Sequence, residues 1–538
     1  MSISLTGLAS NYALPGNYVQ INFAQGPASL GSANYSAIIF ANILSSGTAS
    51  TATASQAFVY GPTTTPSLQT EQDAINLFGA GSEAQIVWSA FTNINKVTPL
   101  YVAPIATASG AAATSTISFT ITNAASTNVA TAVPTSSGSV TVFVAENSVS
   151  IGFSTTDTAT SLATNIVNAI NSQVKWAVTA SAAAATWLST VATVVITLTA
   201  KTVGYRGNFI NFNAVVSQGS NGVASSVTAP TSMSSGSGVD SNAYAIGGVA
   251  STRYYYQISA DGYNTGAGSE TNLKALSTQI TTNALPTNGI RERWFAGSND
   301  SSVANASFCA EALNDVRGCL VWQQSSDYLP CVLASKVAAV VSLLENGFNA
   351  TSLNFDGVGI TANTAGLLSI NAPRSGIVAT PTNLNTALNT GVTPIASTNT
   401  GTGYITKLIT TYCENVSASN VFDYRVRDYH KVSTADRFSD DLISVFAASC
   451  SGKTVAPDPK QNEPPPPNAI TPSVLKGMIN RLERDYYQSG LLININSIIN
   501  GTLVQYNQVT APNVISALVP LQIISVLDQT QTVVNQIS

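Results

Sequence analysis

The sequence has very few charged residues and a single histidine, His430. Lys and Arg together number 21 and Asp and Glu 26, so 9% of the 538 residues are charged, against roughly 25% in an ordinary soluble domain. Histidine is the side chain most used in acid–base catalysis and the commonest metal ligand. We therefore expect no enzymatic activity, no catalytic residue, no metal site and no cofactor.

The charges that are present nearly balance, and long hydrophobic runs are lacking. A net charge of −5 over the whole chain argues against direct binding of nucleic acid and against electrostatic attachment to a membrane. No apolar run approaches the ~18 residues of a membrane span. The opening Met1–Thr6 lacks the basic and apolar stretches of a signal peptide. We expect a protein that is made in a cytoplasm, without membrane insertion.

Cysteine is scarce too, and its spacing excludes the usual frameworks. The five cysteines are an odd number, lie far apart and include no Cys-x-x-Cys pair, so we expect reduced, mostly buried side chains that act as small hydrophobes. Ala, Ser, Thr and Asn fill the sequence instead. Their abundance favours an uncharged polar surface, much of which packs against other copies of the chain.

Residues 1–30 are predicted to form an N-terminal arm rather than a domain. After a turn signal, Asn17–Ala24 alternates between polar and apolar residues, and one face carries Val19, Ile21 and Phe23. A lone alternating segment must pair with something. It is either an edge strand of its own domain or a strand donated to a neighbouring subunit through main-chain hydrogen bonds.

Two regions of different composition follow the arm. Residues 31–106 alternate between strand and helix patterns, with a helix starting at Thr65–Pro66 and ending near Gly79, and are predicted as the first part of a core domain. Residues 107–220 are rich in Ala, Thr and Ser, almost free of charge and strongly alternating, which predicts a separately folding inserted α+β domain. The Ser/Gly/Thr-rich residues 221–245 are predicted as a linker.

The clearest α/β pattern lies in residues 246–412, the predicted central domain. Strand patterns such as Arg293–Ala296 and Leu320–Trp322 are separated by helical segments. Helices between strands imply crossover connections, so we expect a largely parallel sheet. Tyr404–Tyr412 is predicted as its late strand.

Beyond that strand the pattern mixes helices, strands and loops. Residues 413–518 are predicted as the C-terminal helical and strand part of the core, including a charged helix over 422–448. The charges at 422–441 could hold a divalent metal, but a polar face that meets a partner through salt bridges is favoured. Residues 519–538 are predicted to be a C-terminal arm with one strand.

Three short segments resemble chemical motifs without completing them. Thr231–Ser234 is similar to the nucleophile segment of subtilisin-like proteases, but no Gly precedes it and the only histidine follows the serine. Gly79–Ser82 resembles part of a phosphate-binding loop, yet it lacks the lysine and follows a helix, so a helix-ending turn is expected. Asp261 ends a predicted strand and is interpreted as a turn residue.

The order of several weak motifs resembles the tail sheath protein of contractile-tailed bacteriophages, in the Mu-like branch. Leu14–Gln20 is similar to the family's Pro-Gly-x-Tyr-Val opening, and Leu77–Ser82 followed by Pro99–Val102 to a helix end and its next strand. Tyr404–Tyr412 resembles the late strand before the C-terminal helices, and 482–491 also fits the pattern. The resemblance covers essentially the whole chain, and 107–220 resembles an extra outer module.

The resemblance implies a mechanical function. It implies a homo-oligomer of six-membered rings stacked helically around a tail tube, which contracts and drives the tube through the host envelope during genome delivery. The further partners would be the baseplate and the tail terminator or neck proteins. The protein would be assembled in the host cytoplasm and belong to the virion.

The resemblance also implies a fold and a set of contacts. The central domain would have a subtilisin-like α/β topology without a protease site, and extended N- and C-terminal β arms would add strands to neighbouring sheets. The C-terminal arm would do so through Leu521, Ile523, Ile524 and Val526. The C-terminal region would face the tube, so the candidate tube or inter-ring contacts are Arg425, Arg427, Asp428, Arg437, Asp440 and Asp441.

Two other functions stay open at this point. One is the sheath of a phage-derived injection device, such as an R-type bacteriocin or a type VI-like machine. The other is a surface-layer or adhesin-type protein, which the Ala/Thr/Ser/Asn-rich composition would suit, although it would not predict an α/β core.

Overall fold

The computed structural model describes residues 35–526, apart from 55, 218, 263–268, 286–287, 416–420, 424, 461–463, 465, 507–508 and 510–513. The described chain divides into two compact units. A central unit contains residues up to 347 and 352–433, and a C-terminal unit contains 348–351 and residues from 434 onward. The predicted strand of the N-terminal arm, with Val19, Ile21 and Phe23, lies outside the described residues.

The central unit is built on a seven-stranded sheet in the order β16-β15-β14-β13-β12-β1-β2. All neighbouring strands are parallel except β15 and β16, which are antiparallel. The largely parallel sheet predicted from the sequence is therefore confirmed. The strands are β1 (Ala37–Asn42), β2 (Leu100–Ile105), β12 (Tyr256–Gly262), β13 (Arg293–Ser298), β14 (Gly318–Trp322), β15 (Val392–Ser397) and β16 (Gly403–Ile405).

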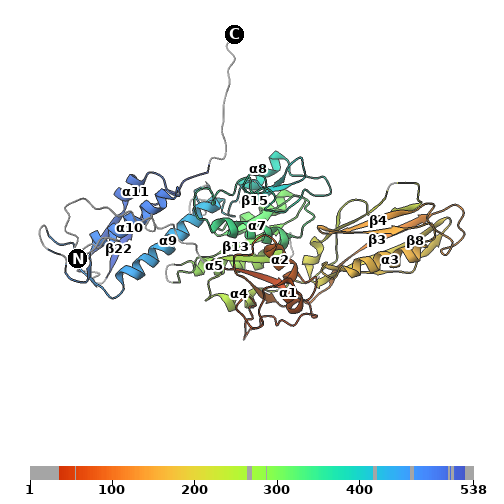
Figure 1. Ribbon diagram of the computed structural model, residues 1–538, viewed down its shortest axis with the longest axis horizontal. Coiled ribbons are helices and arrows are strands. Elements are labelled where there is room, and N and C mark those ends of the chain that lie inside the picture. Colours follow the sequence, from red (N-terminus) through yellow and green to blue (C-terminus); the bar gives the residue numbers. More distant parts are fainter. Residues whose placement is uncertain are drawn as a thin grey trace, which may run out of the picture. The chain divides into compact units, whose positions relative to one another are not determined.

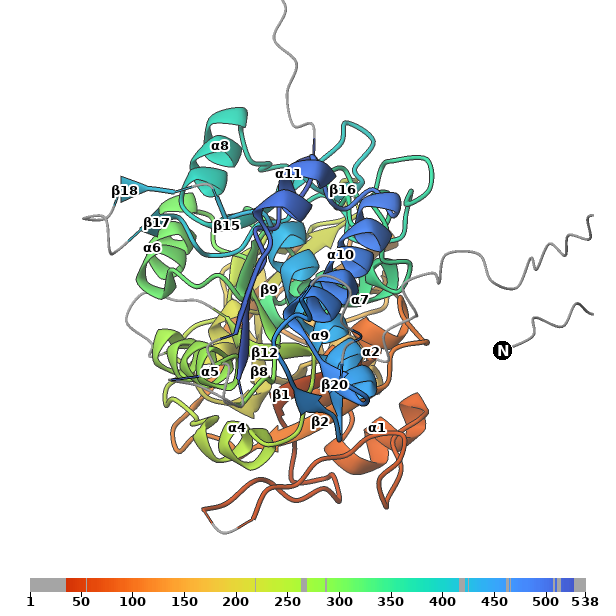
Figure 2. The same cartoon turned by 90° about the vertical axis from the view of Figure 1, so that its left-hand side faces the viewer.

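Helices cover both faces of this sheet. Helices α2 and α7 pack on one face, and α4, α5, α6 and α8 on the other; Figure 2 shows α5 on the left and α2 and α7 on the right of strands β1 and β12. Because both faces are covered, the strands are buried along nearly their whole length. The helices are α1 (Glu71–Phe78), α2 (Glu83–Thr92), α4 (Ala243–Val249), α5 (Ser269–Asn283), α6 (Val303–Leu313), α7 (Pro330–Glu345) and α8 (Pro381–Asn389).

Local signals explain the first helical pair. Thr70 caps α1 in a capping box with Asp73, so the helix begins at Glu71 and not at the predicted Thr65–Pro66. Gly79 ends α1 with φ 86°, and Ser82 caps α2 by accepting from the Gln85 N–H. The Gly79–Ser82 segment is thus a helix-ending turn, as predicted.

The inserted domain pairs two antiparallel sheets with one long helix, α3 (Figure 1). One sheet has the order β10-β3-β8-β6 with β7 beside β8, and the other β11-β9-β4-β5. Alternate residues of β3, such as Ile117, Phe119 and Ile121, are at most 1% exposed and form its core face. The elements are β3 (Ala112–Thr122), β4 (Gly138–Val144), β5 (Asn147–Phe153), α3 (Ala159–Ser172), β6 (Val178–Ala182), β7 (Thr186–Leu188), β8 (Val191–Val203), the 3-10 helix η2 (Tyr205–Phe209), β9 (Asn211–Val216), β10 (Val223–Ser225) and β11 (Thr231–Ser232).

The chain enters and leaves the inserted domain through adjacent segments. Thr114 pairs with Ser234, and Ala111 exchanges hydrogen bonds with Ser237. Part of the predicted linker, 221–245, supplies β10 and β11 to the two sheets. These strands could not be predicted from the sequence because they span only three and two residues, too few to show an alternating pattern.

The C-terminal unit has a small core between helices and a β-hairpin. Ile470, Leu475 and Ile479 are buried, and Leu442, Val504 and Ile515 are among the side chains packed against them. The elements are α9 (Tyr429–Cys450), whose residues up to Ser433 belong to the central unit, β19 (Thr454–Val455), β20 (Ala469–Ile470), α10 (Pro472–Gln488), α11 (Ile495–Gly501), β21 (Leu503–Tyr506) and β22 (Ile515–Leu518).

Two predicted elements differ from the structure. The strand predicted at Tyr404–Tyr412 is regular only as β16, because residues after Ile405 bond instead to separate segments such as Arg427. The charged helix predicted from 422 begins at Tyr429, since β18 (Val421–Phe422) pairs with β17 (Glu414–Asn415). Of the helices described, none is long and apolar enough to span a membrane.

Candidate functional site

The carboxyl edge of the central sheet is where an open α/β sheet would bind a ligand. Strand order changes direction between β1 and β12, since β2 lies on one side of β1 and β13 follows on the other side of β12. Ligands bind in the crevice outside the carboxyl ends of the strands at such a switch point. Asn42 ends β1 and Asp261 lies one residue before the end of β12, so these two residues mark the crevice.

In this protein a buried arginine of the inserted domain fills that crevice. Arg206, on η2, is 7% exposed. Its Nη1 lies 3.0 Å from Glu83 Oε2 and 3.7 Å from Asp261 Oδ1, and its Nη2 pairs with the Asp240 carboxylate. The Asn42 N–H also donates to Glu83 Oε2 at 3.0 Å. The usual ligand position is therefore occupied by a side chain of the protein itself.

The electrostatics of the ion pairs around Arg206 indicate a structural role. Burial raises the pKa of Glu83, and the nearby Arg206 guanidinium offsets that effect only in part. Asp261, interpreted from the sequence as a turn residue, is instead a buried strand residue within the ion-pair network. The sequence carried one faint signal, because Arg206 is one of only a few cations in an almost charge-free region.

A second buried ion pair lies at the opposite, amino edge of the sheet. Arg293 at the start of β13 and Glu345 at the end of α7 are both fully buried, with Nη1 3.3 Å from Oε1. Tyr256 and Ser433 donate to the same carboxylate, and the guanidinium lies 4.8 Å from the centre of the Tyr429 ring. These contacts fix the first turns of α9 to the sheet.

The protease-like segment does not have the geometry of a nucleophile turn. Thr231 and Ser232 form β11, paired with β9, and Ser234 bridges to Thr114. The Ser232 hydroxyl donates to Asn211 Oδ1 at 2.8 Å. His430 is buried in the first turn of α9. The segment therefore has the backbone of short strands.

The cysteines and tyrosines behave as packing residues. Cys309, Cys319, Cys331 and Cys413 are buried free thiols, Cys450 is half-buried, and burial raises the pKa of Cys413 to about 11. Tyr254, Tyr255 and Tyr256 are each at most 7% exposed. The prediction of reduced, mostly buried cysteines is thus confirmed. Within the described ranges, no group of three or more potential metal-ligating side chains is assembled.

The first half of the predicted charged contact set lies in the central unit and is mostly engaged within it. Asp428 accepts from Lys407 at 3.2 Å and from Lys431 at 3.1 Å, and these cations outweigh burial and lower its pKa. The Arg427 side chain is 12% exposed. Arg425 is different: its side chain is 75% exposed although it pairs with Asp423 at 2.8 Å.

The second half of the set lies on α9 in the C-terminal unit. Arg437 Nε is 3.0 Å from Asp441 Oδ1, and the Tyr486 hydroxyl donates to Asp441 Oδ2 at 2.7 Å. Arg437 is 6% exposed and its guanidinium lies over the Phe348 ring. Asp440 is half-buried. Of the six predicted contact residues, Arg425 is the most open to a partner.

The hairpin β21–β22 is the most exposed sheet of the C-terminal unit. Its register pairs Leu503 with Leu518 and Val504 with Ala517. Val504 faces the small core, while Leu503 and Leu518 are 50% and 64% exposed. Within the described part of the chain, no third strand joins either edge of this hairpin.

The predicted C-terminal arm is described as far as Val526. Ile523 forms a bridge with Leu492 of the same chain, and the flanking bonds run from Ile493 N to Gln522 O and from Ile524 N to Leu491 O. Leu521, Ile523 and Ile524 are half-buried, as is Val526. In this structure the segment therefore pairs within its own chain.

Comparison with known proteins gives little. No family model and no curated protein matches the chain. Two solved structures, the D1-D2-D3 and D2-D3 domains of the flagellar cap protein FliD from Escherichia coli, are 18% identical and cover 25% of this chain. The chain covers 40% and 70% of them, respectively, with a TM-score of 0.15 in both cases. At a TM-score of 0.15, this similarity supports no conclusion about the fold or the function of the chain.

Proposed function

We propose that this chain is the structural subunit of a contractile tail sheath, and that it is not an enzyme. In this proposal the subunits form stacked hexameric rings around a tail tube in a virion. The baseplate and the tail terminator or neck proteins are the other partners. The motifs at Leu14–Gln20 and Leu77–Ser82 suggested this family, and one feature of the fold supports it.

The supporting observation is the unpaired hairpin β21–β22. One face of this hairpin packs on the small core through Val504, but its open edges still offer N–H and C=O groups to another strand. Here the hairpin also exposes Leu503 and Leu518 on one face. A strand added from a neighbouring subunit would bond to such an edge and cover part of this apolar pair.

The arms are the natural donors in this proposal. The alternating residues Val19, Ile21 and Phe23 would supply the N-terminal donated strand. The C-terminal arm would donate by exchange, with Leu492 of one copy pairing with Ile523 of the next in place of its own. Exchanging an identical segment between copies needs no new contact type, which keeps its energetic cost low.

The central unit would act as the rigid body of each subunit. Buried ion pairs lie at both ends of its parallel strands, around Arg206 at the carboxyl ends and between Arg293 and Glu345 at the amino ends. Its switch-point crevice is filled by Arg206, so contraction would use no ligand at that position. The energy would come from repacking subunits with more buried interface.

Negative-stain electron microscopy of the purified chain, concentrated and at raised salt, tests the proposal. We expect long, hollow, striated tubes with six-fold end views, and we expect a variant lacking residues 1–24 to form none. Flat two-dimensional arrays would instead support a surface-layer protein. Discrete particles both alone and with purified tail tubes would contradict the proposal.

A further inference from the structure

A cleft of about 600 Å³ lies beside the filled crevice, farther along the carboxyl edge of the sheet. Asn299, Asp300 and Ser301 follow β13, and Ser325 follows β14. The opposite wall comes from the inserted domain and its return segment, and a loop of the central unit completes the lining. These walls contribute Asn208, Phe209, Asn211, Pro230, Ser232, Met233, Ser234, Ser235, Ser375 and Ile377. Clefts of this size and position commonly hold small molecules.

The lining of this cleft is polar but almost uncharged. Apart from four apolar residues and Asp300, every lining side chain is a serine or an asparagine. Asp300 is already engaged: Oδ1 accepts from the Ser302 N–H and Oδ2 from Asn305 Nδ2, both at 2.8 Å. No cation is among the lining residues, so a phosphate or carboxylate would find no counter-charge. The groups presented to a ligand are chiefly serine hydroxyls, which both donate and accept.

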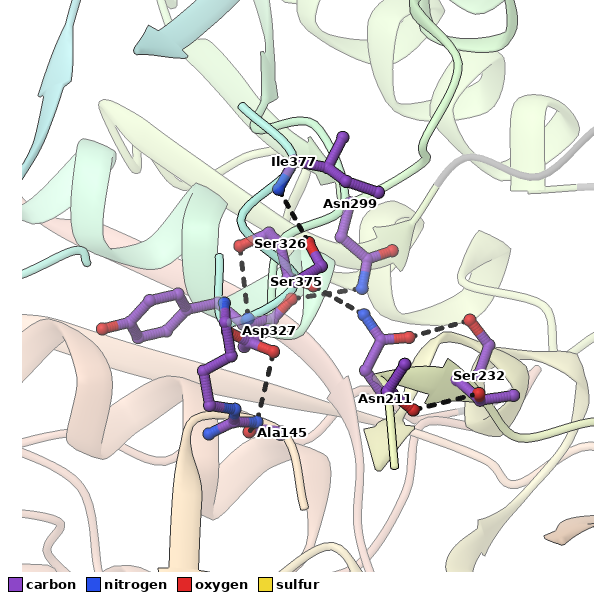
Figure 3. A network of polar contacts seen from close by, with 12 residues as sticks. Ala145, Asn211, Ser232, Asn299, Ser326, Asp327, Ser375 and Ile377 are labelled. Carbon is purple, nitrogen blue, oxygen red and sulfur yellow. Dashed lines mark hydrogen bonds and ion pairs between the residues drawn. The ribbon is translucent and has the colours of Figure 1, made fainter. Parts of the chain in front are cut away.

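The polar groups of the cleft are held in place by bonds that cross between segments. Asn211 Nδ2 donates to Ser326 O at 2.7 Å while its Oδ1 accepts from the Ser232 hydroxyl at 2.8 Å (Figure 3). Asn299 Nδ2 donates to Phe209 O at 3.0 Å and to Tyr328 O at 3.2 Å. Each amide thus links the inserted domain to a loop that follows a strand of the central sheet, and the lining is preorganised.

Apolar side chains complete the lining. Phe209 and Ile377 contribute carbon surface among the hydroxyls, so the cleft offers both the apolar and the polar contacts that a sugar ring makes. The carbon face of a sugar packs on apolar side chains, and its hydroxyls exchange hydrogen bonds with Ser and Asn. Neutral donors and acceptors around an apolar lining suit an uncharged ligand with many hydroxyls.

We propose that this cleft binds a neutral saccharide, at the scale of one or two sugar units. The cleft is formed jointly by the inserted domain and the loops that follow the strands of the central sheet, which gives the inserted domain a binding role besides its structural one. This inference does not rest on the sheath assignment, because the cleft exists within a single chain.

Saturation-transfer NMR and titration calorimetry on the full-length chain test the proposal. The neutral probes are glucose, galactose, mannose and N-acetylglucosamine with their β-1,4-linked disaccharides, and the charged probes are glucuronic acid and glucose 6-phosphate. We expect saturable binding of at least one neutral probe and at least tenfold weaker binding of the charged ones. No signal from any neutral probe up to about 20 mM, or equal binding of the charged probes, would overturn the proposal.

Variants locate the binding. Ser301→Trp places a bulky side chain in the cleft from an exposed position, and we expect at least tenfold weaker binding with unchanged thermal unfolding. Ser232→Ala removes one lining hydroxyl and is expected to weaken binding severalfold. Ser181→Trp, at an exposed position of β6 outside the cleft, is the matched control and should bind normally. Binding that survives Ser301→Trp would place the ligand elsewhere and overturn the assignment.

Discussion

The seven-stranded sheet of the central unit and the hairpin β21–β22 of the C-terminal unit differ in how their edges are protected. The outer edge of β2 is met by Tyr60, which exchanges bonds with Val102 at 2.9 and 2.8 Å, and the other edge ends in the three-residue strand β16. The hairpin β21–β22 has no such protection among the described residues and exposes Leu503 and Leu518. The open edges of the hairpin are therefore a position where a strand of another chain could pair.

This difference indicates where strands of different subunits can pair. The central sheet is covered by helices on both faces and is complete within one chain. Only one face of the hairpin is covered, where it packs against the core around Ile479. Changes to buried contacts of the central unit should therefore alter folding, whereas changes on exposed surfaces such as the hairpin should alter assembly. The four predictions below separate these outcomes.

The largest effect is expected from Glu345→Ala in the central unit. This change leaves the fully buried Arg293 without its carboxylate partner, and breaking a buried pair in this way costs about 3–5 kcal/mol. Urea unfolding followed by tryptophan fluorescence measures it selectively, because all five tryptophans belong to the central unit.

An exposed pair supplies the control for that variant. Lys175 and Glu71 lie 2.7 Å apart with side chains 50% and 43% exposed, so Lys175→Ala should change the free energy of unfolding by no more than about 0.5 kcal/mol. Equal losses in both variants would mean that the buried pair has no special role.

The second effect concerns assembly rather than folding. Leu518→Lys places a charge on the exposed face of the hairpin, and lysine at such strands opposes the addition of another strand. We expect at least a tenfold higher protein concentration for tube formation, with thermal unfolding unchanged. Leu188→Lys, at a 79% exposed leucine of the inserted domain, should polymerise normally. A Leu518→Lys chain that polymerises like the parent would exclude the hairpin as an acceptor.

The third effect is a pH dependence in the central unit. Lys407 and Lys431 lower the pKa of Asp428 below its usual 3.8, so its ionised form stabilises the fold above that pH, and the stabilisation is lost as the pH falls through the lowered value. Asp428→Asn should cost about 1–3 kcal/mol at pH 7 and flatten the loss of stability below pH 4. Glu71→Gln, at an exposed carboxylate, is the control. Parallel pH profiles for Asp428→Asn and the parent would refute this role.

The smallest effect on the isolated chain is expected from Arg425→Glu. Its side chain is 75% exposed, so folding should be unchanged, while assembly on purified tail tubes should be impaired if it contacts the tube or the next ring. Arg427 is unsuitable for the same test because its side chain is 12% exposed and bonds to Leu388 O. Normal assembly of Arg425→Glu would remove this residue from the interface.

Much of the central fold could be predicted from the sequence. Helix α2 matches the alternating strand–helix pattern of 31–106, and β13 and β14 lie where Arg293–Ala296 and Leu320–Trp322 were predicted. The two strands are short, mostly apolar runs between helical segments, a pattern typical of buried parallel strands. The reduced cysteines and the Gly79–Ser82 turn followed from equally local signals.

The long-range contacts could not be predicted. Arg206 contacts Glu83, Asp240 and Asp261 only because the chain returns from the inserted domain to the central sheet. Nothing in the local sequence predicts that return. The predicted charged helix began too early for the same reason, since 421–422 pair with 414–415. Three of the six charged contact residues, Arg427, Asp428 and Asp441, bond to groups distant in sequence, which the sequence pattern alone does not reveal.

The central claim is that a neighbouring copy completes the β21–β22 hairpin, and cryo-electron microscopy of the polymer tests it most directly. We predict a strand from another subunit hydrogen-bonded to β21 or β22, with Leu503 and Leu518 at least partly covered. A polymer in which the hairpin remains two-stranded and both leucines stay exposed to solvent would contradict the account.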